Sequence, residues 1–254
     1  MPAAPLARRA ARPDHSPMTW SLLIRDPATG ALGAAVASRF FAVGALTIAV
    51  EGGVAALSTQ ALVNPMYSVR AMPRLRAGED PATILAALTG ADAGAEQRQF
   101  HILDAQGRIA QHTGPGCIAW AGSVRGTDIS VAGNMLAGPE VVARTLDAFA
   151  AATGPLAERM LAAMEAGEAA GGDRRGKQSA ALKLWSRYPS PDLDIRADDH
   201  PDPLAELRRL YRISLERFAV FRRFLPGAGN EGGVFDRAVI EAAMAREARP
   251  PGAS

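Results

Sequence analysis

Residues 19–40, TWSLLIRDPATGALGAAVASRF, decide the fold. Two runs rich in apolar and branched residues flank the stretch DPATG, in which Asp26, Pro27 and Gly30 are typical turn residues. We therefore predict a β-hairpin whose second strand returns beside the first. Residues 44–60 repeat the design around a Gly-Gly turn, so the sequence predicts four early strands joined by tight turns.

The rest of the chain alternates between strand runs and helix pairs. Residues 1–17 are rich in Ala, Arg and Pro without periodicity, which predicts a disordered leader. Apolar residues at helical spacing predict five helices, at about 66–77, 81–90, 139–152, 155–168 and, as one long amphipathic helix, 202–224. Asp80 before Pro81 is an N-cap signal for the second of them. Further strands are expected within 98–114, as a hairpin that turns at residues 105–107, and within 116–122, 128–136, 177–187 and 193–198.

This order predicts the fold class. Strands and helices in separate runs favour α+β over alternating βαβ units. We expect a four-layer αββα sandwich, in which two mainly antiparallel sheets lie between helices and residues 19–25 form a central strand. One domain is expected over 18–225, followed by a C-terminal tail with a short helix over 226–254.

Composition narrows the function classes. The 254 residues are 48% hydrophobic, which is ample for a buried core, and the net charge of +2 does not favour nucleic acid as a partner. One cysteine, Cys117, excludes a disulfide within the chain and suits a reducing compartment. No apolar run has the length of a spanning helix. We expect a cytoplasmic protein that needs no membrane, cofactor or metal.

Thr19 is the first candidate for chemistry. A threonine hydroxyl is a weak nucleophile that needs an adjacent base, and a free α-amino group on the same residue, with a pKa of about 7.7–8.0, supplies one. Met18 precedes Thr19, and an initiator methionine is normally trimmed before a small residue. The alternative is that Thr19 simply opens the first strand.

Polar residues at the ends of the second and fourth strands are the next candidates. The predicted hairpin brings Arg39 near Thr19, where a guanidinium holds a carboxylate or lowers a nearby pKa. An arginine at a surface strand end explains Arg39 equally well. The amides of Gln60 and Asn64 are suited to orient a substrate or an oxyanion, although Asn64 before Pro65 is also a helix-start signal.

The Gly-rich stretch at 171–178, GGDRRGKQ, precedes a predicted strand. Glycines permit close approach of backbone to a ligand, and the spacing of a P-loop is absent. A helix end that runs into a strand explains the glycines but not the polar residues beside them. The substrate-binding candidates here are Gly172, Asp173, Arg175, Gln178 and Ser179.

Two histidine-containing stretches remain open. Asp198, Asp199, His200 and Asp202 are residue types that bind metals, but Asp202 before Pro203 is typical of a helix cap, which we favour. His112 is assigned to substrate binding, although a lone histidine near a turn is usually structural.

Seven segments, in this order, resemble an uncharacterised Ntn-hydrolase-like (N-terminal nucleophile) family over about residues 18–210. These segments open with a Thr-aromatic-Ser strand and include the Gly-rich loop. They are Thr19-Trp20-Ser21, Ala37 to Phe40, Thr59-Gln60-Ala61 with Asn64-Pro65, His112-Thr113-Gly114 with Cys117, Gly133 to Leu136, Gly171 to Ala181, and Asp198 to Asp202.

The resemblance implies the αββα fold and an N-terminal nucleophile at Thr19. Our leading hypothesis is a hydrolase of small amides or peptides, with Arg39, Asn64 and Asn134 as further catalytic residues. Arg39 and Arg175 point to a carboxylate-bearing substrate. The alternative is a catalytically silent protein of the same fold that binds or assembles, and a metal hydrolase at 198–202 is the weakest alternative. We also expect a homo-oligomer.

Overall fold

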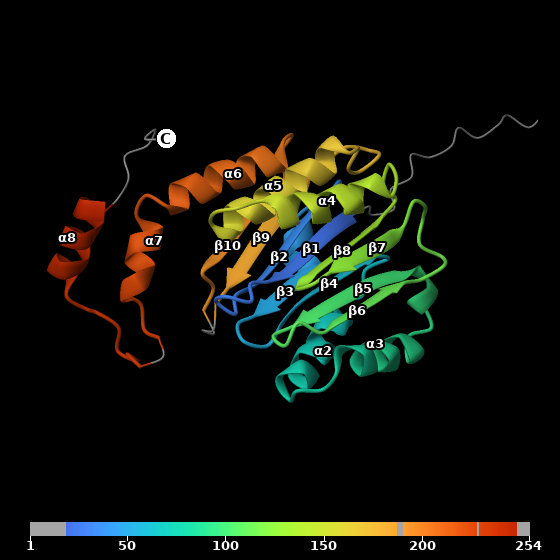
Figure 1. Cartoon of the computed structure of the whole chain (residues 1–254), viewed down its shortest axis with the longest axis horizontal. Coiled ribbons are helices and arrows are strands. Elements are labelled where there is room, and N and C mark those ends of the chain that lie inside the picture. The colour runs from blue at the N-terminus through green and yellow to red at the C-terminus, as the bar shows by residue number, and fades with distance from the viewer. Residues whose placement is uncertain (1–18, 187–189, 228, 248–254) are drawn as a thin grey trace, which may run out of the picture.

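The computed structural model describes residues 19–186, 190–227 and 229–247. In this part of the chain, ten strands form one six-stranded and one four-stranded sheet, and every pair of neighbouring strands is antiparallel. Two antiparallel sheets with separate helices confirm the mixed class predicted from the sequence (Figure 1). The predicted leader, 1–17, lies outside the described residues.

The six-stranded sheet contains the opening hairpin. Gly30, at a φ of 74°, turns the chain after Asp26, and the backbone N–H of Gly30 donates to Asp26 O. The first strand lies between the second and the eighth, so residues 19–25 are central, as predicted. In their order across the sheet the strands are β10 (Leu193–Ala197), β9 (Ser179–Trp185), β2 (Leu32–Ser38), β1 (Thr19–Arg25), β8 (Ile129–Asn134) and β7 (Gly122–Gly126).

The four-stranded sheet follows the chain order without crossovers. Its two hairpins are the ones predicted around the Gly-Gly turn at 52–53 and around residues 105–107. The strands are β3 (Ile48–Glu51), β4 (Ala55–Ala61), β5 (Arg98–Asp104) and β6 (Ile109–Thr113).

Three helices cover the outer face of the six-stranded sheet (Figure 1). Alternate residues of β1, among them Trp20 and Leu22, are buried against apolar side chains of these helices. The helix pair of α4 and α5 follows the predicted one within a residue or so. The three helices are α4 (Glu140–Ala151), α5 (Leu156–Ala169) and α6 (Pro203–Ser214).

Two helices, α2 (Met66–Arg76) and α3 (Pro81–Gly90), lie against the outer face of the four-stranded sheet. The ring of Tyr67 in α2 packs on Phe100 in β5, with centroids 5.1 Å apart. Asp80 caps α3 by accepting a 2.8 Å hydrogen bond from the backbone of Ala82, so the cap signal in the sequence is confirmed.

The remaining face of each sheet is turned toward the other sheet. Half of this inter-sheet layer is apolar and is fully buried. We call this half the apolar inter-sheet half; its buried members are Leu23, Leu32, Ala34, Val36, Val43, Ile48, Ala56, Leu103 and Ala181.

The predicted strand over 116–122 is wrong. This stretch is irregular, and β7 begins only at Gly122. The chain turns at Gly114, where a Cβ would lie 2.2 Å from Glu96 O, and Gly116 N–H donates to the same oxygen. The first N–H groups of this stretch are therefore used in a turn beside the short helix η1 (Ala95–Gln97), while Ile118 O and Trp120 O accept from the backbone N–H groups of Met135 and Leu136, outside the named strands.

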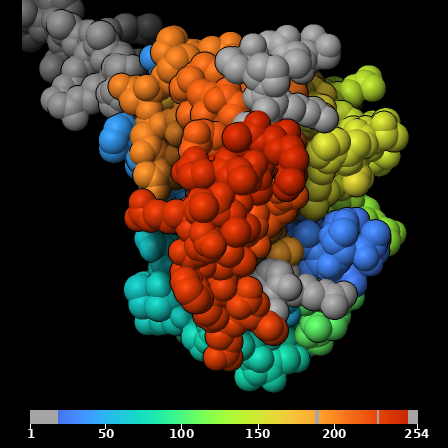
Figure 2. All heavy atoms as spheres, turned by 90° about the vertical axis from the view of Figure 1, so that its left-hand side faces the viewer, coloured from blue at the N-terminus to red at the C-terminus, as the bar shows by residue number. Residues whose placement is uncertain are grey.

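The long helix predicted over 202–224 is interrupted. α6 ends at Ser214, whose hydroxyl donates a 2.6 Å hydrogen bond to Tyr211 O, a contact that bends helices. A small separate core follows, in which Val220 packs with Ile240 and Met244. It joins α7 (Phe218–Phe221), η2 (Arg222–Phe224) and α8 (Arg237–Glu247) at the end of the molecule seen in Figure 2.

One short helix, α1 (Val43–Leu46), was not predicted, because it has four residues and no side-chain cap. Over residues 19–186, 190–227 and 229–247, none of the helices combines the length and the apolar character needed to cross a bilayer.

Candidate functional site

Thr19 lies at the first position of the central strand, with its hydroxyl directed into the inter-sheet layer. The alternation along β1 turns Trp20 toward the helices and the residues on either side of it toward the second sheet. Thr19 is only 2% exposed, and its Oγ1 lies 3.3 Å from the hydroxyl of Ser38, at the end of β2. The nucleophile candidate is thus held between strands on both sides.

Asn134 is the β8 residue that pairs with Thr19. Its side-chain Nδ2 lies 3.4 Å from the backbone oxygen of Thr19 and donates a 3.2 Å hydrogen bond to Gln99 Oε1. Asn134 is 1% exposed. Of the proposed catalytic amides, this is the one that directly contacts Thr19.

Gln99 of β5 connects the sheets. Its Nε2 donates to Thr113 Oγ1, Gly122 O and Gly133 O at 2.9–3.1 Å. Its Oε1 accepts from Gln60 Nε2 at 2.7 Å, in addition to the bond from Asn134. Gln60, which the sequence assigned to substrate binding, is therefore a buried member of a hydrogen-bonded network.

The network continues to a buried histidine. Ser21 Oγ donates to Gln60 Oε1 at 2.8 Å and lies 2.8 Å from His101 Nε2. The hydroxyl of Ser130 lies 2.7 Å from His101 Nδ1 and itself accepts from Gln111 Nε2. We call these linked side chains the polar inter-sheet network: Ser21, Ser58, Gln60, Gln99, His101, Gln111, Thr113, Ser130 and Asn134.

The directions of these bonds fix the tautomer of His101. Ser21 gives its only hydroxyl proton to Gln60, so His101 Nε2 must carry the hydrogen that Ser21 accepts. His101 Nδ1 then accepts from Ser130. Burial lowers the pKa of His101 to about 3, so the ring is neutral at physiological pH. Ser21 and His101 are both 0% exposed, and the imidazole donates to Ser21 rather than removing its proton, which excludes a serine–histidine dyad here.

The Gly-rich loop lies across the ends of β2 and β8. Asp173 accepts hydrogen bonds from the backbone of Arg39 at 3.0 Å and of Arg175 at 2.8 Å, and it forms a backbone bridge with Leu136. The backbone of Gly172 has a φ of 46°, and its carbonyl oxygen accepts a hydrogen bond from the N–H of Ala137. β1 lies between these two strands, so the loop and Thr19 share one end of the sheet.

Arg39 and Arg175 both contact the Gly-rich loop. Arg39 Nη1 donates to Arg175 O, and Arg175 Nη2 lies 3.4 Å from Asp173 Oδ2. The hairpin argument placed Arg39 correctly at the end of β2, on the same sheet end as Thr19. Whether either arginine binds substrate stays a prediction.

Gln178 and Ser179 hold the start of β9. Gln178 donates from its backbone to Ser38 O at 2.9 Å and from its side chain to Asp199 at 3.1 Å. The Ser179 hydroxyl donates to Phe40 O and accepts from Val43 N–H. Both side chains are thus occupied by neighbouring structure.

Asn64 and His112 have structural partners away from the network. Asn64 Nδ2 donates to Asp92 at 3.0 Å, while its Oδ1 accepts from Met66 N–H at the start of α2. Hydrogen bonds from Gly94 N–H and then from Asn64 hold the pKa of Asp92 well below its usual range. His112 Nε2 lies 2.9 Å from Ala95 O.

The acidic run at 198–202 has helix-cap geometry. Asp202 accepts from Ala205 N–H at 3.1 Å as the N-cap of α6, and it pairs with Lys177 at 2.7 Å. Asp198 pairs with Arg196 at 2.9 Å, and His200 Nδ1 accepts from the backbone of Asp202. The cap interpretation of Asp202 is confirmed.

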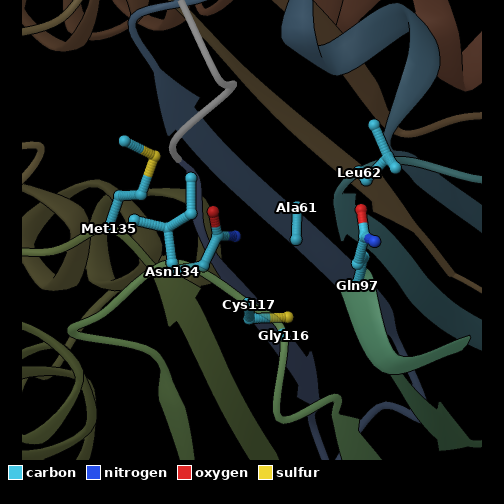
Figure 3. A pocket seen from close by; sticks show the side chains of 8 residues that line it. Ala61, Leu62, Gln97, Gly116, Cys117, Asn134 and Met135 are labelled. Atoms are coloured by element: carbon cyan, nitrogen blue, oxygen red, sulfur yellow. The ribbon is translucent and has the colours of Figure 1, made fainter. Parts of the chain in front are cut away.

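A pocket opens between the ends of the two sheets, beside Asn134 (Figure 3). It has a volume of about 100 Å³. Ala61 at the end of β4 and Met135 after β8 both have positive φ, 66° and 54°, which is uncommon for residues with a Cβ and is often found at functional sites. The lining residues are Ala61, Leu62, Gln97, Gly116, Cys117, Ile118, Asn134 and Met135.

Sequence reasoning missed most of the polar network. The signal in the sequence was polar residues on one face of three strands. They are Thr19 and Ser21 in β1, Gln99 and His101 in β5, and Ser130 in β8. Such alternation ordinarily predicts a solvent-facing side of a sheet. Here the second sheet covers that side, and only the three-dimensional packing reveals that these residues bind one another.

The model of a family of unknown function, DUF1028, matches residues 19–207. Among curated proteins there is no match. The crystal structure of a Silicibacter pomeroyi protein assigned to the same family is 30% identical, with a TM-score of 0.81 over 86% of this chain and 96% of that chain.

Two further solved structures are more distant. Eukaryotic HslV from Trypanosoma brucei is 10% identical with a TM-score of 0.36, over 65% of this chain and 98% of that one. Anbu, an ancestral β-subunit from Yersinia bercovieri, is 13% identical with a TM-score of 0.37, over 82% and 98%. Similarities at this level support no statement about function.

Proposed function

The chain belongs to the family of unknown function DUF1028, and we propose that it is an amide-bond hydrolase whose nucleophile is Thr19 as the first residue of the mature chain. The observation that carries this proposal is the position of Thr19 Oγ1. The hydroxyl lies at the end of a central strand, 3.3 Å from Ser38 Oγ and next to Asn134, which lines the pocket.

The proposal includes the fold type. Helices α4, α5 and α6 on one side and α2 and α3 on the other enclose the two sheets (Figure 1). This order supports assignment to the four-layer αββα sandwich of the Ntn-hydrolase type, in which a nucleophile at the start of a central strand is the expected arrangement.

The mechanism uses groups that surround Thr19. Its free α-amine accepts the hydroxyl proton as Oγ attacks the substrate carbonyl carbon. The carbonyl oxygen becomes an oxyanion, and the amide of Asn134 is placed to donate to it after releasing its present long contact to Thr19 O. The ammonium returns its proton to the leaving nitrogen as the C–N bond breaks. Water then attacks the ester on Thr19, releases the acid and restores the hydroxyl.

The buried network supports this assignment through Asn134. Gln99 accepts from Asn134, and four further hydrogen bonds fix Gln99 itself. A donor held by packing and by further hydrogen bonds stabilises developing charge better than a mobile one, because its dipole does not reorganise during the reaction.

A substitution pair tests the proposal. With protein that begins at Thr19 and a panel of small amides and dipeptides, Thr19→Ala should lower turnover by roughly 10³-fold or more, whereas Thr19→Ser should retain part of it. Both variants should unfold at the same denaturant concentration as the parent chain. The control is Thr29→Ala, which removes an exposed hydroxyl in the β1–β2 turn and should leave turnover unchanged.

The rival function is a catalytically silent binding protein of the same fold. The peptide bond between Met18 and Thr19 in the full chain favours it, because an amide nitrogen cannot act as the base. Absence of turnover from every correctly trimmed preparation would favour the rival. Turnover that survives Thr19→Ala would instead show that another nucleophile acts.

A further inference from the structure

The pocket and Thr19 belong to the same opening between the sheets. Asn134 pairs with Thr19 on one side and lines the pocket on the other. In Figure 3, the side chains of Asn134 and Gln97 lie on opposite sides of the opening, with Cys117 between them. A group bonded to Thr19 Oγ therefore has the pocket as its neighbouring space.

The walls of this pocket carry no full charge. None of the eight described lining residues is Lys, Arg, Asp or Glu. Cys117 is the ionisable one among them, and burial raises the pKa of its thiol, so it is neutral. Ala61, Leu62, Ile118 and Met135 make most of the wall apolar.

The arginines that suggested an acidic substrate do not line this pocket. Arg39 donates to the carbonyl of Arg175, and Arg175 faces the carboxylate of Asp173. Arg98, whose guanidinium donates to the backbone oxygen of Leu62 at the pocket wall, is itself paired with Asp92. A carboxylate in the pocket would therefore meet no opposite charge on the lining side chains, which is unfavourable.

The pocket has room for a bound side chain. About 10–15 Å³ of such a cavity holds one water molecule, so a volume of about 100 Å³ admits a group of several heavy atoms. The positive φ of Ala61 and Met135 fixes the two strand ends that border the pocket.

We infer that this pocket receives an uncharged aliphatic side chain on the acyl side of the scissile amide. The inference rests on the proposed function and replaces a carboxylate-bearing substrate by a neutral one. Its specificity-determining residues are Gln97, Cys117 and Ile118, which line the pocket together with Asn134.

Matched amides test this inference. Protein that begins at Thr19, which contains every described strand and helix, is assayed with aminoacyl amides that differ only in the acyl side chain. We expect kcat/KM for the alanine and valine amides to exceed that for the glutamate amide by about 10²-fold.

A charge substitution provides the second arm. Gln97→Lys places an ammonium group at the pocket and should reduce the preference for valine over glutamate by about 10-fold. Gln106→Lys adds the same charge at an exposed turn of the four-stranded sheet and should leave the preference unchanged. If Gln97→Lys and Gln106→Lys show the same preference for valine over glutamate, the role of the pocket is contradicted.

The outcomes separate this inference from the proposed function. Covalent labelling with activated esters that carry valine or glutamate side chains reports the same preference as an acyl-adduct mass on Thr19, because Thr19 attacks the ester carbonyl and the activating alcohol leaves. Adducts or turnover that favour glutamate would overturn the inference and keep the hydrolase. If no side chain gives turnover or an adduct on Thr19, both the inference and the proposed function are overturned.

Discussion

The inter-sheet layer has two halves of opposite chemistry. The apolar inter-sheet half packs Leu23, Val36 and Leu103 as an ordinary core. The polar inter-sheet network, in the same layer, buries Gln99 and His101 as completely, at 0% exposure. Residues of the two halves follow one another along one face of the same strand, as Gln99, His101 and then Leu103 do on β5.

The difference shows where the fold replaces apolar packing by hydrogen bonds that hold side chains in fixed positions. A buried polar group is tolerated only when it is hydrogen-bonded, and the network meets this condition through side chains from both sheets. It ends at Asn134, beside Thr19. A rigid polar core that reaches the nucleophile candidate supports a functional rather than a purely structural reason for the polar half.

The largest difference in stability between the two halves is expected when one residue in each half is replaced by methionine. Gln99→Met keeps a similar length but removes every hydrogen bond of the amide, which leaves buried partners unsatisfied at about 1–3 kcal/mol each. We expect the free energy of unfolding to fall by about 3 kcal/mol or more in denaturant titrations. Leu103→Met, four residues along the same face, should cost less than about 1.5 kcal/mol.

Equal losses in the free energy of unfolding for Gln99→Met and Leu103→Met would contradict the difference between the two halves. They would mean that the amide of Gln99 contributes no more than its volume, and that the network does not stabilise the fold.

A smaller effect is expected from pH. The unfolded chain protonates His101 near pH 6.5, whereas the folded chain does so only near its pKa of about 3. Unfolding therefore takes up a proton between these values, and the free energy of unfolding falls as pH falls through this window. From pH 7 to pH 5 this contribution is about 2 kcal/mol, and it should be absent in His101→Gln, which keeps a donor and an acceptor.

Parallel denaturation curves at pH 7, 6 and 5 for the parent chain and His101→Gln measure this difference. A parent chain whose pH dependence matches that of His101→Gln would show that His101 is not held neutral by burial.

The smallest effect is expected from Ser130→Ala. It removes the hydroxyl between His101 Nδ1 and Gln111 Nε2, while Gln111 keeps its 2.9 Å bond to Val124 O. We expect a loss of about 1–2 kcal/mol in thermal or chemical unfolding, because one buried acceptor is left without a donor. A stabilised variant would show that His101 is satisfied without Ser130.

Features encoded locally in the sequence were predictable. The turn at Asp26 and Gly30 identified the central hairpin, and the caps at Asp80 and Asp202 identified helix starts. The same hairpin argument placed Arg39 at the end of β2, on the sheet end of Thr19.

Features that depend on distant partners were not predictable. Ser21 and His101 are 80 residues apart in the chain, and their contact exists only because one sheet covers the other. The amide of Asn64 binds Asp92, 28 residues away, which no local pattern indicates. The irregular stretch at 116–122 has the composition of a strand, but contacts of Gly114 and Gly116 with Glu96 hold it out of the sheet.

The most direct test of the Thr19 mechanism is the intact mass of the active protein from its native source, measured on the fraction that hydrolyses small amides. The mechanism requires a free α-amine on Thr19, so the active chain should begin at Thr19, either by initiation at Met18 with its removal or by cleavage of the preceding residues. An active chain that retains residues 1–18 would contradict the mechanism, because the amine of Thr19 would then be an amide without basicity.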